Sequence, residues 1–581
     1  MRLLIPWLWS GVRSSGPPAT CAYLFPILLA IGALLPGTAL AQFQRPGDER
    51  PELPPFEAPD RKPGGILPPV PLPREPDTEG LSGGVRVRIR GVRVTGNTAL
   101  SDEELNEITA PYADREVSAA DLEALRDQLT RAYIQRGYVS SGAVLPDQTL
   151  EDGIVEFRIV EGTLGDLGIE TDGRLRESYL RSRIERGADG PVNVREIEER
   201  LQILQQDDHI RSVQAALTPG EVRGESILRV RVAEEKPYRV LLRGDNYETP
   251  SIGAEGGGVD LAYANITGFG DSFSIRYRGT EGLQDASASY EIPLNSYDTT
   301  FDLHTSQSWA DVVEEPFDEL DVESRSETYG VTLRHPVYRS LGSRLEVFLT
   351  AEWRRSKTYL LGMPFSFTRG PEEGVATVSV LRFGQDWSYR TRRQVFAARS
   401  MLTLGLDLLG ATIHDEKVPD GDFLAWLGQL QWARRFDFLD TELIARCDAQ
   451  LATSPLLGLE QFAIGGRYTV RGYREKTLVR DNGLVGSLEV RFPVWRRADT
   501  RPILELAAFV DAGYSWDRTR EGIESIDPET LLSVGLGARW LFTNHLRAEI
   551  YWGHAIEEVE YAGPWNLQDS GLHLQLSFAF P

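Results

Sequence analysis

The chain shows four successive patterns of apolar and polar positions, and the first is an apolar run over residues 22–35 that Pro26 interrupts. A small-residue motif, Ala39-x-Ala41, follows this run and fits a signal-peptidase cleavage site. The alternative, a transmembrane anchor, is disfavoured because the run is short and contains Pro26. We therefore predict a signal peptide over residues 1–41.

Residues 42–84 show no periodicity and are dense in proline. Proline lacks a backbone donor and fixes its own φ, so such a segment favours an extended, partly polyproline conformation. A ligand for an SH3-type domain is one interpretation of this composition. An extracytoplasmic linker is the interpretation that the preceding signal peptide favours.

From residue 85 the pattern is that of a small α/β unit, which we place at residues 85–162. Alternation over residues 85–94 predicts one strand, and Ser101-x-x-Glu104 has the form of a capping box that begins a short helix. The remaining elements are expected to be a helix over 118–135 and strands over 138–145 and 153–160.

The same order of elements repeats over residues 163–235. We expect a strand over 167–169, helices over 176–185 and 194–205, and strands over 213–217 and 226–232. A supersecondary order that occurs twice in tandem is an internal repeat, which is typical of an array of modules.

Residues 236–581 lose the helical period and alternate between apolar and polar side chains in about sixteen segments of roughly ten residues. An even number of antiparallel strands suits a closed single-chain barrel, and closure leaves no backbone hydrogen bond unmade in lipid. A large secreted β-sandwich or propeller is the alternative. Aromatic residues near strand ends, such as Trp309 and Trp516, favour a membrane interface. The predicted fold class is α+β modules followed by an all-β transmembrane barrel.

Composition narrows the function further. The 62 Lys and Arg against 86 Asp and Glu give a formal net charge of −24, which disfavours a nucleic-acid binder that must neutralise phosphates. Two cysteines cannot form a multi-thiolate metal site. The H-E-x-x-H, G-x-S-x-G and phosphate-loop motifs do not occur in the sequence. We therefore predict no enzyme activity, no catalytic residue, no metal and no cofactor.

One predicted strand carries a carboxylate inside the barrel. Phe509, Asp511 and Gly513 share one face of this strand, and that face must point into the lumen because a carboxylate exposed to lipid is costly. An arginine suited to a carboxylate, Arg471, lies in a long loop that we place at residues 454–481. From the residues alone, Arg471 and Asp511 are either an ion pair or two separate lumenal charges.

The first α/β unit resembles a POTRA domain. The resemblance rests on Val94-Thr95-Gly96-Asn97 before a capped helix and on Tyr133-Ile134-Gln135-Arg136-Gly137-Tyr138. It implies that residues 85–162 and 163–235 are POTRA 1 and POTRA 2, two periplasmic modules. Such modules are thought to bind unfolded client chains by adding a strand to an open sheet edge.

The long loop contains Val470-Arg471-Gly472-Tyr473, which resembles the V-R-G-Y/F motif of a transporter superfamily that carries POTRA domains. The F-x-D-x-G motif of that superfamily stands here as Phe509-x-Asp511-x-Gly513. The resemblance implies that the loop folds back into the lumen, where Arg471 pairs with Asp511 and fixes one loop conformation. On this hypothesis, Arg471→Ala impairs secretion while the barrel still inserts.

The chain ends on alternating apolar residues that resemble an outer-membrane insertion signal: Leu572, Leu574, Leu576, Phe578 and Phe580. The resemblance implies that the barrel assembly machinery inserts this chain into outer-membrane lipid.

Two POTRA-like units before a barrel of about sixteen strands resemble the two-partner secretion transporters of TpsB type, which secrete and activate haemolysins and adhesins. The implied partner is a large secreted exoprotein of TpsA type with an N-terminal secretion domain. The POTRA domains would recognise it unfolded in the periplasm, and the barrel would translocate it across the outer membrane. Two alternatives remain open: an assembly factor that inserts other barrels, and a passive porin. The sequence does not identify the exported partner.

Overall fold

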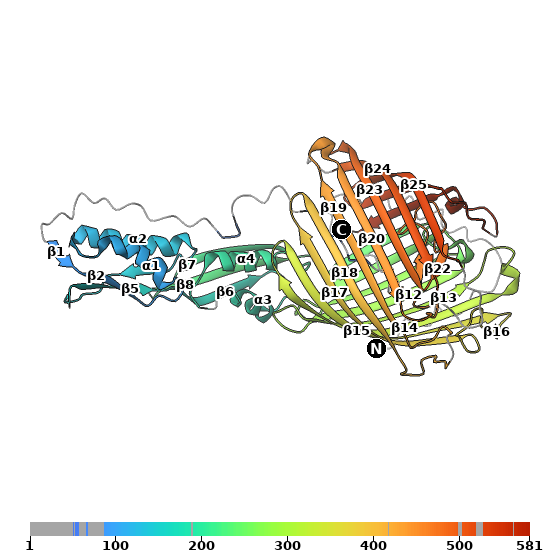
Figure 1. The fold of residues 1–581 in the computed structure, drawn as a ribbon, viewed down its shortest axis with the longest axis horizontal. Coiled ribbons are helices and arrows are strands. Elements are labelled where there is room, and N and C mark those ends of the chain that lie inside the picture. Colours follow the sequence, from blue (N-terminus) through green and yellow to red (C-terminus); the bar gives the residue numbers. More distant parts are fainter. Residues whose placement is uncertain are drawn as a thin grey trace.

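The computed structural model describes residues 50–51, 53–56, 65–67, 86–150, 152–187, 190–222, 224–415, 418–497, 502–518, 527–561 and 563–580. The predicted signal peptide lies outside these residues, as does most of the predicted linker. Two α/β units extend in line from one end of a large barrel (Figure 1). None of the helices within the described ranges is long and apolar enough to cross a membrane.

The first α/β unit contains β1 (Arg86–Ile89), β2 (Gly91–Thr95), α1 (Asp102–Thr109), β3 (Arg115–Ser118), α2 (Ala119–Gln135), β4 (Gly142–Val144) and β5 (Ile154–Val160). The capping box expected at Ser101 and Glu104 begins α1. The prediction of one strand over residues 85–94 is wrong. β1 pairs with β3, whereas β2 runs parallel to β5. The apolar positions change parity at the break, from Val87 and Ile89 in β1 to Val92 and Val94 in β2, and the one-strand prediction overlooked this shift at Gly91.

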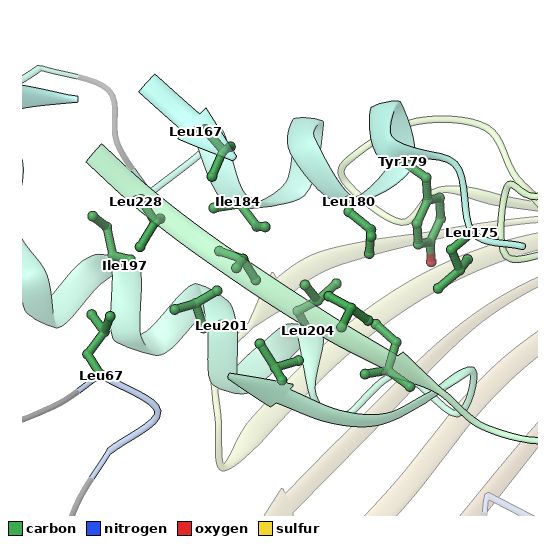
Figure 2. Close-up of a cluster of buried hydrophobic side chains, with 14 of the residues drawn as sticks. Leu67, Leu167, Leu175, Tyr179, Leu180, Ile184, Ile197, Leu201, Leu204 and Leu228 are labelled. Carbon is green, nitrogen blue, oxygen red and sulfur yellow. The ribbon is translucent and has the colours of Figure 1, made fainter. Parts of the chain in front are cut away.

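The second α/β unit contains β6 (Thr163–Thr171), α3 (Glu177–Glu185), α4 (Val194–Leu204), β7 (Ile210–Pro219) and β8 (Glu225–Glu234). Its sheet has the order β6-β8-β7, and apolar residues of α3 and α4, such as Leu180 and Leu201, fill the core against the sheet (Figure 2). Leu67, which precedes the first unit in the chain, also packs into this core (Figure 2). The backbone N–H groups of Ile66 and Leu67 donate to the Glu198 carboxylate of α4 at 2.6 and 2.8 Å.

The barrel is closed by sixteen strands that cross its wall within the described part of the chain, and a seventeenth, β16 (Met363–Pro364), pairs only with the end of β15. The crossing strands are β9 (Tyr238–Asp245), β10 (Gly256–Ala264), β11 (Ser272–Gly279), β12 (Leu283–Pro293), β13 (Thr300–Asp311), β14 (Val322–Arg339), β15 (Ser343–Leu360), β17 (Val375–Arg390), β18 (Gln394–Leu406), β19 (Leu424–Arg435), β20 (Glu442–Ala452), β23 (Asn482–Arg496), β24 (Pro502–Trp516), β25 (Glu529–Leu541), β26 (Leu546–Ala555) and β27 (Leu572–Ala579).

Every neighbouring pair of crossing strands is antiparallel, and β27 pairs with β9 to close the barrel. Side chains alternate between the lumen and the outer surface, as the period of two requires. On β24, for example, Asp511 is 0% exposed, whereas its outward neighbour Val510 is 40% exposed. The predicted number of strands and their antiparallel order are confirmed.

The second α/β unit docks on the strand turns at one end of the barrel. Arg183 of α3 pairs with Asp298 in the turn between β12 and β13 at 2.8 Å. The backbone N–H of Arg176 donates to the carbonyl of Gly268, in the turn between β10 and β11, at 2.9 Å. The Arg176 guanidinium also lies 4.5 Å from the ring centroid of Phe269. These contacts place the sheet of the second unit next to the mouth of the barrel.

Candidate functional site inside the barrel

The connection between β20 and β23 folds back into the barrel lumen. It contains a short hairpin, β21 (Phe462–Ile464) paired with β22 (Leu478–Arg480), and its tip lies between these two strands in the sequence. The tip residues Val470 and Tyr473 are 0% and 1% exposed, so the tip of the loop is buried. The predicted long loop, residues 454–481, is therefore an interior element.

Arg471 at the tip of the loop holds Asp511 of β24 in a bidentate contact. Its Nε and Nη2 donate to the two Asp511 oxygens at 2.7 and 2.8 Å, and its backbone N–H adds a third bond at 3.1 Å. Nη1 of Arg471 donates to Glu489 of β23. The guanidinium is thus shared by two carboxylates, and all three side chains are 1% exposed or less.

Aromatic side chains enclose the guanidinium. The Arg471 Cζ lies 3.5 Å from the ring centroid of Phe509 and 5.1 Å from that of Tyr551. A planar cation over an aromatic face is favourable, more so when water is excluded. Phe509 is therefore the surface on which the guanidinium lies, beside the carboxylate that it binds.

Glycines make the close approach between loop and wall possible. A Cβ on Gly513 would lie 2.6 Å from a methyl of Ile464 and 2.9 Å from one of Val470, so a side chain there would collide with the loop. Gly472 has φ of +96°, and a Cβ there would lie 2.9 Å from the backbone of Gly553 on β26. The bend expected at Gly472 and the space expected at Gly513 are both present.

The other two residues of the loop motif are also buried. Val470 packs in an apolar cluster with Phe462 and Ile464 of the same loop and Val485 of β23. The Tyr473 hydroxyl lies 3.0 Å from the carbonyl of Leu532 on β25 and accepts from the N–H of Leu532 at 3.2 Å. The four motif residues thus contact four neighbouring strands of one wall, β23 to β26.

Further ion pairs that the sequence did not indicate hold the loop along its length. They join Arg467 to Glu549 at 3.0 Å, Arg474 to Asp569 at 2.5 Å, and Glu460 to Arg382 at 2.8 Å. Glu489 was missed as well. Its parity on the predicted strand indicates a lumenal position, but only the register of β23 against β24 brings it beside Arg471.

A described fragment of the predicted linker also lies inside the barrel. The side chain of Arg50 donates to the carbonyl of Tyr468 in the long loop and pairs with Asp448 of β20. The Gln431 amide of β19 donates to the carbonyl of Pro51 at 2.6 Å. Residues 50–51 and 53–56 therefore cover the same wall as the long loop.

The residues of the expected insertion signal lie on β27, apart from Phe580, which follows it. Leu576 and Phe580 are exposed on the outer surface, whereas the intervening Ser577 is buried. This arrangement fits a lipid-facing strand at the closure of the barrel. Its role as a signal stays a prediction.

A model of the family described as haemolysin secretion/activation protein ShlB/FhaC/HecB matches residues 224–540, and a model of the ShlB-type POTRA domain matches residues 87–162. The chain belongs to the haemolysin secretion/activation family. It is an outer-membrane transporter of the two-partner secretion type, and in this family POTRA domains lie in the periplasm. The predicted family, fold class and location are confirmed.

Curated relatives and solved structures agree with this family. The outer membrane transporter CdiB of Escherichia coli O6:K15:H31 (strain 536 / UPEC) is 24% identical over 434 residues, which cover 71% of this chain and 70% of the relative. The hemolysin transporter protein ShlB of Serratia marcescens is 23% identical over 425 residues, 68% of this chain and 70% of the relative.

Two solved structures share the fold. The structure of CdiB from Escherichia coli matches with a TM-score of 0.64 at 20% identity and covers 88% of this chain and 94% of its own. BamA from Haemophilus ducreyi lacking POTRA domains 1–3 matches with a TM-score of 0.52 at 13% identity, over 85% of this chain and 100% of its own. At these identities the likeness shows the fold alone.

Proposed function

We propose that this transporter captures a large exoprotein of TpsA type in unfolded form with its two α/β units and passes it through the barrel to the cell surface. The order of modules supports this proposal, because the second unit is docked on the barrel turns beside the mouth. Family membership supports it too, and one of the relatives, ShlB of Serratia marcescens, is a hemolysin transporter protein. The client carries an N-terminal secretion domain, and the α/β units recognise the client through this domain.

Capture is proposed to occur at sheet edges. We propose that residues 163–235 form a second POTRA domain behind the first, residues 85–162, because the two units share an order of elements. In the second unit, β8 lies between β6 and β7, so the described pairing leaves β6 and β7 at the edges of the sheet. An edge strand offers N–H and C=O groups to any extended peptide and makes little demand on its sequence.

The single observation that carries the proposal is the bidentate contact of Arg471 with Asp511. We propose that this contact locks the long loop to the wall and so keeps one lumen conformation, with Val470, Gly472, Tyr473, Phe509 and Gly513 as its supports. A buried ion pair adds little net stability but can specify one arrangement among several. The lock is therefore a positioning device.

Export by an Arg471→Ala variant tests the lock. We expect the exported partner in the culture medium to fall severalfold, because the loop is no longer held in one conformation, while the barrel is present at normal level in the outer membrane. The matched control is Arg399→Ala. Arg399 makes a bidentate contact with Asp386, but this contact joins two wall strands and does not involve the loop. Equal export by both variants would refute the lock.

An assembly factor that inserts other barrels is the alternative function. Depleting the chain and measuring the level of unrelated outer-membrane barrels separates the two functions. If the chain is a transporter, its depletion leaves these levels unchanged and abolishes export of one partner. A large exported protein encoded beside this chain would supply that partner.

Two terminal features belong to the same proposal. We propose that residues 1–41 direct export to the periplasm and are removed, and that residues 42–84 then connect the lumen fragment to the first unit. Insertion by the barrel assembly machinery would use the alternating residues that end at Phe580. Mass spectrometry of the mature N-terminus checks the cleavage site after Ala41.

A further inference from the structure

The lumen has two unlike sides. Inward-facing residues of β19, β20, β23 and β24 lie beneath the long loop and are almost fully buried, as Gln429 (2%), Asp448 (3%) and Glu489 (1%) show. Inward-facing residues of β11 to β14 border a cavity of about 930 Å³ and remain partly exposed. The cavity is therefore bordered on one side by partly exposed wall residues and on the other by the long loop, which contributes Phe462, Tyr468 and Glu475 to its lining.

Short hydroxyl side chains cover the open side. We call them the hydroxyl face: Ser274, Ser287, Ser289, Ser306, Ser308 and Thr328. They are neighbours across strands, because Ser274 is opposite Ser289, and Ser306 is opposite both Ser287 and Thr328. The hydroxyls of Ser274 and Ser289 lie 2.8 Å apart and bond to each other. Four successive strands thus present a polar surface rich in hydroxyls, in which Arg276 is opposite Ser287, His304 is opposite Ser289 and Asp285 is opposite Ser308.

The charged residues beside the hydroxyl face have partners. Arg276 donates to Asp260 at 2.7 Å, and Arg278 pairs with Asp245. The ring of His304 lies 2.7 Å from Asp302 and 3.2 Å from Glu352. These neighbouring charges are already engaged on the wall, which weakens their hold on a passing charged segment.

We propose that the hydroxyl face is the surface along which the unfolded client chain slides through the barrel. This inference rests on the proposed export function and names its path. A hydroxyl both donates and accepts, so it can satisfy the backbone N–H and C=O groups of any extended chain regardless of sequence. Its contacts are weak and uncharged, so no client segment is held tightly. The opposite side is closed to the client by the long loop and its ion pairs.

The first test measures access with a defined probe. The starting chain carries Cys447→Ser, because Cys447 is an exposed thiol. Single cysteines are placed on the hydroxyl face (Ser287→Cys, Ser306→Cys) or beneath the loop (Ser515→Cys, Ser533→Cys), where both serines are 0% exposed. The probe is an uncharged Gly/Ser/Asn peptide of about 15 residues, which spans roughly 50 Å when extended and carries a thiopyridyl-activated cysteine.

The full chain in liposomes is incubated with this peptide, and the mixed disulfide is measured over time. We expect cysteines on the hydroxyl face to react at least about tenfold faster, because reaction beneath the loop requires local opening first. Equal rates, or faster reaction at residues 515 and 533, would overturn the proposed path.

The second test measures export in cells that also produce the partner exoprotein encoded beside the chain, with an epitope tag. Ser306→Arg and Ser306→Trp are expected to lower the exported amount severalfold, whereas Ser306→Thr keeps the hydroxyl and exports normally. Each variant is compared at equal level in the outer membrane. If the unaltered chain exports nothing, the proposed function fails. If it exports and Ser306→Arg exports equally well, the function stands and the path along the hydroxyl face is wrong.

Discussion

At the residue scale, the long loop depends on one guanidinium placed between two carboxylates. The two carboxylates are not equivalent, because Glu489 also accepts from Arg491 at 2.5 Å. By contrast, both hydrogen bonds that arginine side chains donate to Asp511 come from Arg471. Removing Arg471 therefore leaves Asp511 as the uncompensated charge in a buried site.

The stability of the loop variants follows from this difference. We expect Arg471→Ala to destabilise the native state by about 3–5 kcal/mol, as for other broken buried pairs, and Asp511→Ala in the same chain to recover part of the loss. The midpoint of heat unfolding, followed as loss of the compact band on SDS gels, measures both. In the control, Arg399→Ala costs less because Asp386 keeps Arg334 at 2.8 Å. A double variant less stable than Arg471→Ala would contradict this account.

Glycine positions give a second prediction at this scale. A Cβ on Gly553 would lie 2.6 Å from the backbone nitrogen of Gly472, whereas a Cβ on Gly486 would have nothing within 4 Å. We expect Gly553→Ala to displace the loop tip and to expose it to protease, while Gly486→Ala leaves it protected. Limited proteolysis of the purified chain, with cleavage mapped to residues 465–475, measures the difference. Equal protection in the two variants would show that the backbones do not need this contact.

The candidate site was predictable from sequence in part. Motif spacing and strand parity together place Arg471 and Asp511 in one lumen, and Gly513 marks the close approach. Glu489, Arg467 and the other ion pairs could not be inferred, because a polar lumen contains many charges. Which of them meet depends on how the loop folds back and on the register between strands.

At the element scale, alternation located every crossing strand because each one separates lipid from lumen along its whole length. Periodicity failed in the first α/β unit, where β1 and β2 follow each other closely but belong to different sheets, and in the long loop, where it did not predict the hairpin of β21 and β22. Alternation describes a strand and says nothing of its partner. Where hairpins join neighbours, partners follow from sequence order. In the α/β units they do not.

A pH-dependent contact joins the second unit to the barrel. The ring of His209 lies 2.6 Å from Asp207 and bonds to the backbone of Asp271, in the turn between β10 and β11. Burial would lower the pKa of His209, but the hydrogen bond and charge of Asp207 outweigh it and raise this pKa above its usual value. Burial would likewise raise the pKa of Asp207, but bonds from His209 and Tyr179 hold it at about 2.

The sign of this dependence is fixed by the raised pKa of His209. The stabilisation that protonated His209 gives to this contact is complete below the ordinary histidine pKa of about 6.5. It is lost as pH rises through the higher pKa of His209 in the folded chain. We expect hydrogen exchange at residues 265–271 to be slower in the unaltered chain than in His209→Gln at low pH, and the difference to vanish at high pH. Comparing the two chains at the same pH removes the effect of pH on the intrinsic rate of hydrogen exchange. A difference independent of pH would contradict the prediction.

At the scale of the whole molecule, capture and passage lie in one line. The two α/β units lead to one end of the barrel (Figure 1), and the space inside it lies against the hydroxyl face. The long loop and residues 50–51 and 53–56 occupy the other side. The molecule therefore combines a fixed wall, held by ion pairs, with an open wall of small hydroxyls, and export requires the fixed wall to stay in place.

Restoring export with a covalent tether tests the central claim most directly. A Cβ on Gly513 lies 2.9 Å from a Val470 methyl, so Val470→Cys with Gly513→Cys suits a disulfide between loop and wall, provided that Ile464→Ala in the same chain removes the methyl that would lie 2.6 Å from the new Cβ. In a Cys447→Ser chain that also carries Arg471→Ala, the measurement is the exported partner in the medium with the disulfide formed or reduced. If Arg471 acts by holding the loop, the oxidised tether restores export and reduction abolishes it. A tether that forms completely and leaves export low would contradict the account.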